Sequence, residues 1–499
     1  METAKLGTVI TTQDSPSVSS FAFVIDEKNP VKRGQFISVL TEEGTLIANV
    51  MNIFKTNRYF ESAGSVKEYS KANDLQHSFP IKEWEYTIAE AKLLGVYAAD
   101  GSLNRPSFPP SPGNSVLEVE PDLLNKFLGF DQENGLHLGD VQQHNLKAKF
   151  NLTKLLQKHL AVLAMSGAGK SYAVSVLIEE LLSRKSGKIA VLIIDNHGEY
   201  VSLSKEKELA DKIKIIDATE VKIALQHFSA QMIAKLFPSM SAVQTRELGK
   251  TLDSLRKAGK PFEVSDVISA VEQSESLTEA SSGALLAWLS ELDSLGIFGK
   301  ADWPNFDAVL EPGKAVILNF REMLDLRRKQ LIVDYVSKRI FGLRRKEMVP
   351  PYLEIIEEAH NFCPEKMKSE NALSKGIIET LAREGRKFYA NLCLISQRPV
   401  QLSTTALSQC NTHIILRVTN PYDLDHIKKS AESISQSTLD VISSLKVGEA
   451  LVLGEAVNYP VFVKIRQRKS KESHGTKLEE YAVQWEGAKG KLAKGSDFL

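Results

Sequence analysis

The chain has 499 residues, of which 43% are hydrophobic and 25% are charged, and its 62 basic and 62 acidic residues give a formal net charge of zero. A chain of this length is expected to form about three domains, and its neutrality excludes nucleic-acid binding driven by bulk positive charge. No segment has the long apolar run that a membrane-spanning helix needs, and the start METAKLGTVI lacks the apolar core of a signal peptide, so we expect a cytoplasmic protein without membrane contact.

The first part of the chain is predicted to be β-structure. Short β-branched and apolar runs at 21–26, 35–40 and 45–53 are separated by Gly, Pro and Asn residues, as in a small all-β domain. We expect these strands to close into a barrel within residues 1–135. The segment 105–114, RPSFPPSPGN, is too rich in proline to continue a central strand or a helix, and it marks a loop that leads out of the barrel.

From about residue 136 the pattern changes to apolar strands that alternate with helical stretches, which is typical of a parallel sheet covered by helices on both faces. We expect this α/β core to occupy residues 136–218 and 307–465. Between these two parts, in residues 219–306, apolar residues recur at helical spacing and predict a helical insertion. The predicted strands of the core are 160–163, 189–195, 315–320, 352–356, 391–396, 412–418 and 449–454.

The last segment, 466–499, is polar and rich in lysine, with Leu478, Tyr481 and Trp485 as isolated large apolar residues. Such a segment cannot make a core of its own. Two interpretations stay open. The segment is a solvated, partly disordered end, or it is a C-terminal arm that lays Tyr481 and Trp485 on a neighbouring subunit.

The turn AMSGAGKS at 164–171 follows an apolar strand and opens a helical stretch. It matches the phosphate-loop pattern G-x-x-x-x-G-K-[ST] except at the first position, where Ala164 replaces Gly. In such a turn the backbone N–H groups point at phosphates and the helix adds the positive end of its dipole. We therefore expect ATP and Mg²⁺ to bind here. The predicted nucleotide-binding residues are Ser166, Gly167, Ala168, Gly169, Lys170, Ser171 and Tyr172.

Each residue type in the turn has an expected task. The Lys170 ammonium reaches the β- and γ-phosphates, and the Ser171 hydroxyl is a Mg²⁺ ligand. The strand at 352–356 ends in two carboxylates. We expect Glu357 to join the Mg²⁺ shell through a water molecule and Glu358 to act as the general base that polarises the attacking water.

Polar residues also lie at the carboxyl ends of two other predicted strands. Gln397 follows the strand in CLISQRP, and if this strand lies beside the phosphate-loop strand, the amide can sense the γ-phosphate. Asp195 and Glu199 follow the strand in IIDNHGEY. We expect both at the carboxyl edge of the sheet, where they contribute to nucleotide binding or to coupling between subunits.

The segment LAREGRKF places Arg383 and Arg386 three residues apart on one helix face. The strand that follows spans roughly 25 Å at about 3.3 Å per residue, which separates both arginines from the Gln397 edge of their own sheet. The hypothesis that remains is an arginine finger that acts in trans on the site of the adjacent subunit. The alternative is a surface guanidinium paired with an acid such as Glu384.

Six motifs in this order, behind a β-rich N-terminal part, resemble the HerA family of the HerA/FtsK superfamily, archaeal DNA-translocating ATPases: AMSGAGKSY, IIDNHGEY, IIEEAHNF, REGRKF, ISQRP and LRVTNPYD. The resemblance covers nearly the whole chain. It implies an α/β RecA-like P-loop ATPase core with an N-terminal β-barrel domain, assembled as a homo-hexamer around double-stranded DNA. It also implies partnership with a NurA-type nuclease in DNA end resection during double-strand break repair. Ala164 and Asn196 depart from the family pattern, and neither departure removes a catalytic group.

DNA in the pore of such a ring is gripped through its phosphates by loops of the core. The loops after Glu199 and Glu358 offer basic residues for this contact, although a charged loop is usually only solvated. These candidate DNA-binding residues are Lys205, Lys366, Lys368 and Lys375.

The predicted function is ATP-dependent translocation or unwinding of double-stranded DNA. The alternative is a ring scaffold that ATP binding locks and that docks and activates a nuclease with little translocation. A membrane-associated conjugation or secretion ATPase of the same superfamily is disfavoured, because the sequence lacks membrane-spanning segments.

Overall fold

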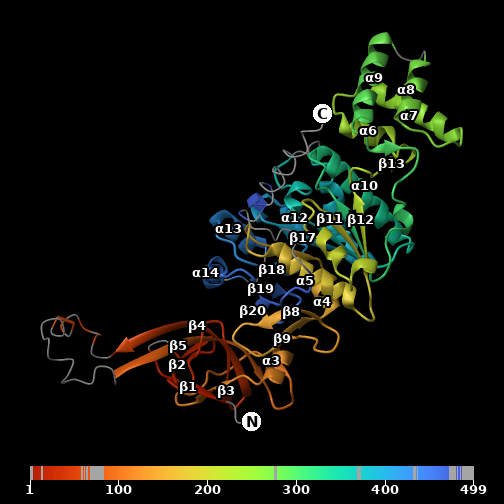
Figure 1. The fold of residues 1–499 in the computed structure, drawn as a ribbon. Helices are drawn as coiled ribbons and strands as arrows, with labels where there is room; N and C mark the ends of the chain where they lie inside the picture. Colours follow the sequence, from red (N-terminus) through yellow and green to blue (C-terminus); the bar gives the residue numbers. More distant parts are fainter. Residues whose placement is uncertain are drawn as a thin grey trace. The chain divides into compact units, whose positions relative to one another are not determined.

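The computed structural model divides the chain into two compact units, one formed by residues 1–154 and 449–466 and the other by residues 155–448 and 467–499 (Figure 1). No helix among the described residues has the length and apolarity needed to cross a membrane. The structure describes residues 4–12, 15–57, 60, 62, 64, 66–67, 84–274, 278–367, 372–430, 434, 436–470, 479, 481–483 and 485.

A β-barrel opens the first unit. Six strands pair antiparallel in the order β2-β1-β7-β3-β4-β5, and β2 pairs with β5 to close the ring, while β6 extends from β5. Phe21, Phe23, Ile37 and Leu46 fill the interior and are almost fully buried. The predicted barrel is therefore confirmed. Its strands are β1 (Lys5–Ile10), β2 (Ser20–Ile25), β3 (Phe36–Thr41), β4 (Gly44–Asn57), β5 (Glu85–Tyr97), β6 (Leu103–Asn104) and β7 (Ser115–Glu118).

The rest of the first unit contains helix α3 (Pro121–Leu128) and antiparallel strands in the order β19-β20-β8-β9. The parallel pattern expected from residue 136 is therefore wrong for this stretch. Only a short turn joins β8 to β9, whereas a parallel pair needs a crossover of a dozen or more residues. The strands are β8 (Leu136–Val141), β9 (Lys147–Phe150), β19 (Glu449–Gly454) and β20 (Val461–Ile465).

The second unit is built on a parallel sheet with the strand order β12-β15-β11-β16-β17-β10-β18. Its central strands are buried on both faces, which explains why they read as continuous apolar runs. The predicted α/β core is confirmed, and strand β12 is an addition to it. The strands are β10 (Leu160–Leu163), β11 (Ala190–Asp195), β12 (Ile213–Asp217), β15 (Ala315–Asn319), β16 (Tyr352–Ile356), β17 (Ala390–Ser396) and β18 (Thr412–Ile415).

Helices connect the strands of this sheet. Longer helices follow β10 and β15, and short 3₁₀ segments carry several of the turns at the strand ends. The α-helices are α4 (Leu152–Leu156), α5 (Lys170–Ser183), α10 (Leu326–Arg345), α11 (Lys375–Glu384), α12 (Thr404–Leu407), α13 (Pro421–Ser430) and α14 (Gln436–Ser444). The 3₁₀ helices are η3 (Val201–Lys205), η4 (Ala210–Lys212), η5 (Leu225–His227), η6 (Phe306–Ala308), η7 (Ala359–Asn361), η9 (Gly385–Phe388) and η10 (Pro399–Gln401).

The predicted helical insertion is present as a lobe of four helices within the second unit (Figure 1). Helix α7 begins with a capping box, in which Ser241 and Gln244 each accept the other's backbone N–H. One detail differs from the expectation of an all-helical segment, because β13 (Ile223–Ala224) and β14 (Phe298–Gly299) pair in parallel. The helices are α6 (Ala230–Leu236), α7 (Ala242–Lys257), α8 (Val264–Glu272) and α9 (Glu279–Ser294).

Candidate nucleotide-binding site

Three of the predicted catalytic residues, Glu357, Glu358 and Gln397, follow strands that end at the carboxyl edge of the parallel sheet. Strand β17 pairs with β10 on one side, with Leu163 opposite Ser396, and with β16 on the other side, with Ile356 opposite Leu394. The residues that follow these strand ends are therefore neighbours, although more than two hundred positions separate Leu163 from Ser396 in the sequence. The phosphate loop, the two glutamates, Gln397 and Asp195 therefore all lie at the carboxyl edge of the sheet.

The phosphate loop has the backbone geometry that its sequence predicts. Gly167 and Gly169 adopt the left-handed region, with φ of 74° and 94°, which glycine enters at little cost. Helix α5 begins at Lys170, and the first N–H groups of a helix have no partner within the helix. The loop therefore presents backbone donors and the positive end of the α5 dipole to an anion.

The departure at Ala164 has a structural explanation. Ala164 is buried, and its N–H donates to the Ser396 carbonyl at 3.2 Å, which continues the pairing between β10 and β17. The next N–H, from Met165, donates to the Arg417 carbonyl at 2.9 Å on the other side. An extended residue that still belongs to the sheet does not need the conformational freedom of glycine.

Lys170 and Glu358 form a buried ion pair. The Lys170 Nζ donates to Glu358 Oε1, and the two residues are only 8% and 2% exposed. Glu358 follows β16 and has a left-handed backbone with φ of 49°, which turns its carboxylate toward the phosphate loop. His360 Nδ1 lies 3.4 Å from Glu358 Oε2 and 3.1 Å from the Ser396 hydroxyl, and burial lowers the pKa of its imidazole.

Glu357 points into a different, acidic environment. Its Oε2 accepts the His197 N–H at 3.1 Å. Burial first, and then the nearby Asp195 and Glu199 carboxyls, raise the pKa of Glu357 to about 10. This carboxyl therefore holds a proton at neutral pH until a cation compensates its charge.

Asp195 shapes the turn that follows β11. Its Oδ1 accepts the N–H groups of Gly198 and Glu199 at 2.8 and 2.9 Å, and its Oδ2 accepts that of Tyr200 at 2.9 Å. Burial raises the pKa of Asp195 in spite of these contacts. The structure thus gives Asp195 a role in holding the turn beside Glu357, and Glu199 lies close enough to influence that carboxyl.

The residues present fit a Mg²⁺ ion that is shared with a nucleotide. Glu357 Oε1 is buried and has no hydrogen-bond partner among the described residues. Within those residues no three His, Cys, Asp or Glu side chains are grouped to hold a metal by themselves. Mg²⁺ usually binds one or two protein oxygens together with phosphates and water, so Ser171 and Glu357 are sufficient protein ligands.

Gln397 and the two arginines lie at opposite ends of β17. Gln397 is half-buried and directly follows this strand, which is paired with the phosphate-loop strand as the sensor hypothesis requires. Arg383 and Arg386 are exposed near its start, where Gly385 lies next to His159, the residue before β10. The arginines are therefore remote from their own phosphate loop. Their action in trans stays a prediction.

The surroundings of Arg383 are those of the alternative considered for it, a surface guanidinium near an acid, although the acid is Glu379 and not Glu384. Its guanidinium lies 3.9 Å from Glu379, one helical turn earlier, and half of its side chain is exposed. This ion pair is weak by distance and exposure, so it leaves the guanidinium available to another group.

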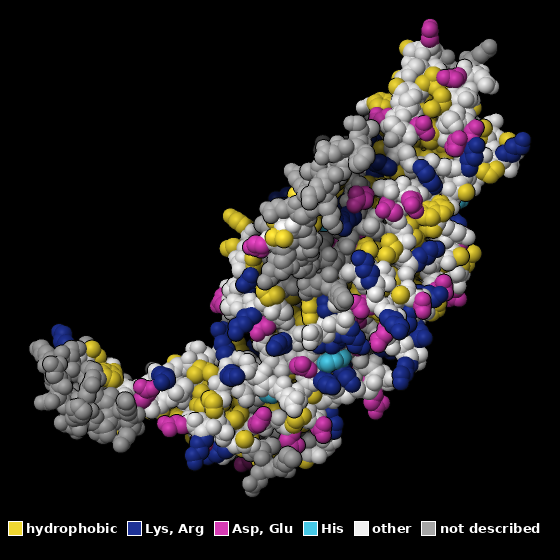
Figure 2. All heavy atoms as spheres, viewed as in Figure 1, with side chains coloured by type: hydrophobic (Ala, Val, Ile, Leu, Met, Phe, Trp, Pro, Cys, Tyr) yellow, Lys and Arg dark blue, Asp and Glu magenta, His cyan; other side chains and the backbone are white. Residues whose placement is uncertain are grey.

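The candidate DNA-binding lysines that the structure describes differ in their surroundings. Lys205 and Lys366 are exposed, whereas the Lys375 Nζ donates to the Glu365 carbonyl at 3.1 Å and is thereby engaged within the core. Lys368 lies outside the described residues. On the visible face of the second unit, acidic and basic side chains are interspersed, as the zero net charge suggests (Figure 2).

The start of the C-terminal segment is tied to helix α5. The Arg468 N–H donates to the Tyr172 hydroxyl at 2.8 Å, and its guanidinium lies 5.8 Å from the centre of that ring. Glu179, on the same helix, accepts from the N–H and hydroxyl of Ser470 at 2.9 and 2.6 Å. Tyr481 and Trp485 are more than half exposed, and Leu478 lies outside the described residues. Glu179 is a buried acid within an apolar helix, and none of the predicted motifs contains it.

Comparison with known proteins agrees with this geometry. Residues 136–340 match the family model described as the central domain of helicase HerA. The chain is 27% identical over 461 residues to a probable helicase of Methanocaldococcus jannaschii, across 88% of this chain and 87% of the relative. It is also 27% identical over 519 residues to the DNA double-strand break repair helicase HerA of Pyrococcus furiosus, across 90% of each chain.

The chain thus resembles HerA helicases over most of its length. The solved structure of VirB4 from Thermoanaerobacter pseudethanolicus has a similar fold, with a TM-score of 0.53 and 15% identity over 68% of this chain and 98% of that one. The predicted resemblance and the prediction of a P-loop ATPase are thus confirmed. The individual roles of the site residues in this chain remain proposals.

The raised pKa of Glu357 predicts a pH-dependent stability. The folded chain binds a proton that the unfolded chain releases above its ordinary pKa of 4.5, so the free energy of unfolding falls as pH rises from about 5 toward about 10. Glu357→Gln removes this titration. In EDTA at pH 9 we expect its melting temperature to exceed that of the unaltered chain by about 2–4 °C, with a smaller difference at pH 5.

The control is Glu322→Gln, because the Glu322 side chain is 71% exposed. This variant should keep the pH dependence of the unaltered chain. An equal melting temperature of Glu357→Gln and the unaltered chain at pH 9 would mean that Glu357 is ionised in the folded state without a metal.

Proposed function

We propose that this HerA-family ATPase translocates along or unwinds double-stranded DNA as a homo-hexameric ring in the cytoplasm and supports nuclease-driven end resection in double-strand break repair. One observation carries the proposal: Lys170, Glu358 and Gln397 converge at one edge of a parallel sheet. They supply an amine for phosphates, a carboxylate for water and an amide for the γ-phosphate. The relatives named as double-strand break repair helicases support the assignment to DNA.

The geometry suggests how the site works. Backbone N–H groups of the phosphate loop and the Lys170 ammonium bind the phosphates, while Ser171 and Glu357 would hold Mg²⁺. When bound, Mg²⁺ neutralises charge on the β- and γ-phosphate oxygens. The nucleotide draws Lys170 away from Glu358, with which it is paired, and the freed carboxylate then polarises the attacking water. Nucleotide binding and activation of Glu358 are therefore the same event, in which Lys170 exchanges the Glu358 carboxylate for the phosphates.

Strand β17 offers a path between neighbouring sites. Gln397 at its carboxyl end is placed to contact the γ-phosphate, and Arg383 and Arg386 lie just before its other end. A shift of the strand on loss of the γ-phosphate moves the arginines that serve the adjacent subunit. Hydrolysis in one subunit thereby alters the site of the next, as a ring motor requires.

The first test separates binding from chemistry. Lys170→Ala should weaken ATP binding by about 10–100-fold, because it removes a charged contact to the phosphates. Glu358→Gln should keep nucleotide affinity and lower kcat by about 10²–10⁴-fold, because it removes the general base. Fluorescent-nucleotide titration and a phosphate-release assay with duplex DNA measure the two effects. Equal loss of binding in both variants would contradict the assignment of Glu358.

A second test addresses action in trans. Arg383→Ala and Glu358→Gln subunits should each be inactive alone, whereas mixed rings place an intact arginine against an intact base at some interfaces. We expect the mixture to recover measurable DNA-stimulated ATPase activity. The absence of recovery at every mixing ratio, in rings shown by light scattering to contain both subunits, would remove the trans role of Arg383.

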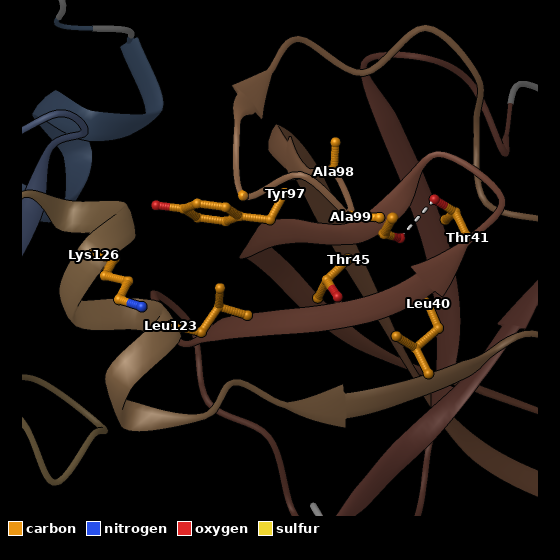
Figure 3. Close-up of a pocket in the computed structure, with 10 residues that line it drawn as sticks. Leu40, Thr41, Thr45, Tyr97, Ala98, Ala99, Leu123 and Lys126 are labelled. Atoms are coloured by element: carbon orange, nitrogen blue, oxygen red, sulfur yellow. Dashed lines mark hydrogen bonds between the residues drawn. The ribbon is translucent and has the colours of Figure 1, made fainter.

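The barrel offers a separate surface for a partner protein. A cavity of about 490 Å³ lies between the β3–β4 turn, the end of β5 and helix α3 (Figure 3). Leu40 lines it and is 62% exposed, and Tyr97 projects along its wall. The Thr41 hydroxyl donates to the Gly44 carbonyl at 2.9 Å and holds the turn at its rim. We propose this apolar hollow as the docking place of a NurA-type nuclease, which is also what the scaffold alternative needs.

Leu40→Asp places a charge in this hollow without altering the ATPase core. We expect nuclease binding to weaken by about tenfold or more, while DNA-stimulated ATP hydrolysis by the chain alone is unchanged. Co-purification and calorimetric titration with a NurA-type nuclease provide the measurement. Val18→Asp, at another exposed apolar position of the same unit, is the matched control. Equal binding by both variants would place the partner elsewhere.

A further inference from the structure

A buried lysine outside the predicted site lies next to its acidic turn. Lys329, in the first turn of α10, is only 9% exposed. Its Nζ donates to Asn196 Oδ1 at 2.7 Å and lies 3.5 Å from the Asn196 carbonyl oxygen. Asn196 itself is 5% exposed. An amine is costly to bury, and packing alone would be satisfied by an apolar side chain of the same length.

The contact leads directly to Glu357. Asn196 precedes His197, whose N–H is the donor to Glu357 Oε2 at 3.1 Å. Asp195 holds the other half of the same turn through the N–H groups of Gly198, Glu199 and Tyr200. Helix α10 therefore holds the side chain of Asn196, the residue before the His197 N–H that donates to the Glu357 carboxylate.

The start of α10 is itself firmly placed, so the amine has a defined position. Gln330 Nε2 donates to the Asn361 carbonyl at 2.7 Å, and Gln330 Oε1 accepts the Leu373 N–H at 3.0 Å. Arg327 pairs with Glu291 of the helical insertion at 2.9 Å. Three neighbouring side chains thus connect this helical turn to the insertion, to the turn after β11 and to the loop after β16.

We propose that Lys329 is a positioning residue for ATP hydrolysis: by holding Asn196 it fixes the His197 N–H that orients the Glu357 carboxyl toward the nucleotide-bound Mg²⁺. The inference rests on the proposed ATPase function and adds a residue that none of the predicted motifs contains. Lys329 does not touch the substrate in this role. It acts through its hydrogen bond to Asn196, the Asn196–His197 peptide unit and the hydrogen bond from the His197 N–H to Glu357.

The decisive variant is Lys329→Met, which keeps the length and apolar contacts of the side chain and removes the donor. Lys338→Met is the matched control, because Lys338 lies on the same helix and pairs with Asp334 at 2.5 Å away from the Asn196 turn. Both full-length variants are titrated with a fluorescent ATP analogue in EDTA and in Mg²⁺, and their kcat and KM are measured with duplex DNA.

For Lys329→Met we expect ATP-analogue affinity in EDTA to equal that of the unaltered chain. The gain in affinity on adding Mg²⁺ and the value of kcat should each fall about 10–100-fold, the usual range for a residue that orients a metal ligand. Lys338→Met should match the unaltered chain in all three measurements. Lys329→Arg, which can still donate to Asn196, should recover part of the loss.

A double variant tests the route. Lys329→Met combined with Asn196→Ala should be no worse than either single variant, because both remove the same contact. Additive losses, or a Mg²⁺ effect and kcat equal to those of the unaltered chain, would overturn the proposal. A loss of kcat that is matched in EDTA binding and accompanied by a lower melting temperature would show a purely structural role and would overturn it as well.

The binding measurement keeps this inference separate from the proposed function. If the unaltered chain binds the ATP analogue more tightly in Mg²⁺ but releases no phosphate, the ATPase proposal fails, while the loss of the Mg²⁺ effect in Lys329→Met still tests Lys329. If the unaltered chain hydrolyses ATP and Lys329→Met retains the full Mg²⁺ effect, only the role of Lys329 fails.

Discussion

The parallel pairing of β17 between β10 and β16 is the constraint on which the rest of the site depends. It aligns Leu163 with Ser396 and Ile356 with Leu394, so the loops that follow three distant segments open side by side at one sheet edge. The pairing even extends one residue beyond β10, where Ala164 donates to Ser396. A slip of one residue in this register would turn the glutamates and Gln397 to other faces of the sheet.

Charge compensation at that edge explains the remaining features. Five ionisable side chains are largely buried there. Lys170 pairs with Glu358, backbone N–H groups donate to Asp195, the raised pKa of Glu357 keeps that carboxyl neutral, and Lys329 donates to Asn196, the residue after Asp195. Such an arrangement is tolerable only while every charge is balanced. In the proposed mechanism, a magnesium-bound nucleotide would bring both a cation for Glu357 and phosphates for Lys170. Nucleotide binding would then exchange the partners of these side chains without a requirement for new ones.

Two elements extend from this edge to distant parts of the second unit. Strand β17 joins Gln397 to the segment with Arg383 and Arg386, and helix α10 joins the turn at Asn196 to the helical insertion through Arg327. Both are regular, well-buried elements, so a displacement at one end is carried to the other. In the proposed ring, strand β17 would transmit a change at Gln397 to the arginines that face a neighbouring subunit. Helix α10 connects the insertion, through Lys329 and Asn196, to the turn beside Glu357.

The sequence alone determined the elements whose information is local. The phosphate loop, the glutamate pair and Gln397 each follow a continuous apolar strand, and their motifs are short enough to be read directly, as is the helical period of the insertion. Only the tertiary structure decided the contacts made across long separations. Lys329 lies 133 positions from Asn196, and Lys170 lies 188 from Glu358. The antiparallel pairing of β8 with β9 and the tie of Ser470 to Glu179 also depend on partners that no local pattern announces. The burial of a side chain and the compensation of its charge depend on its neighbours in the folded chain, so the residue type at one position does not predict them.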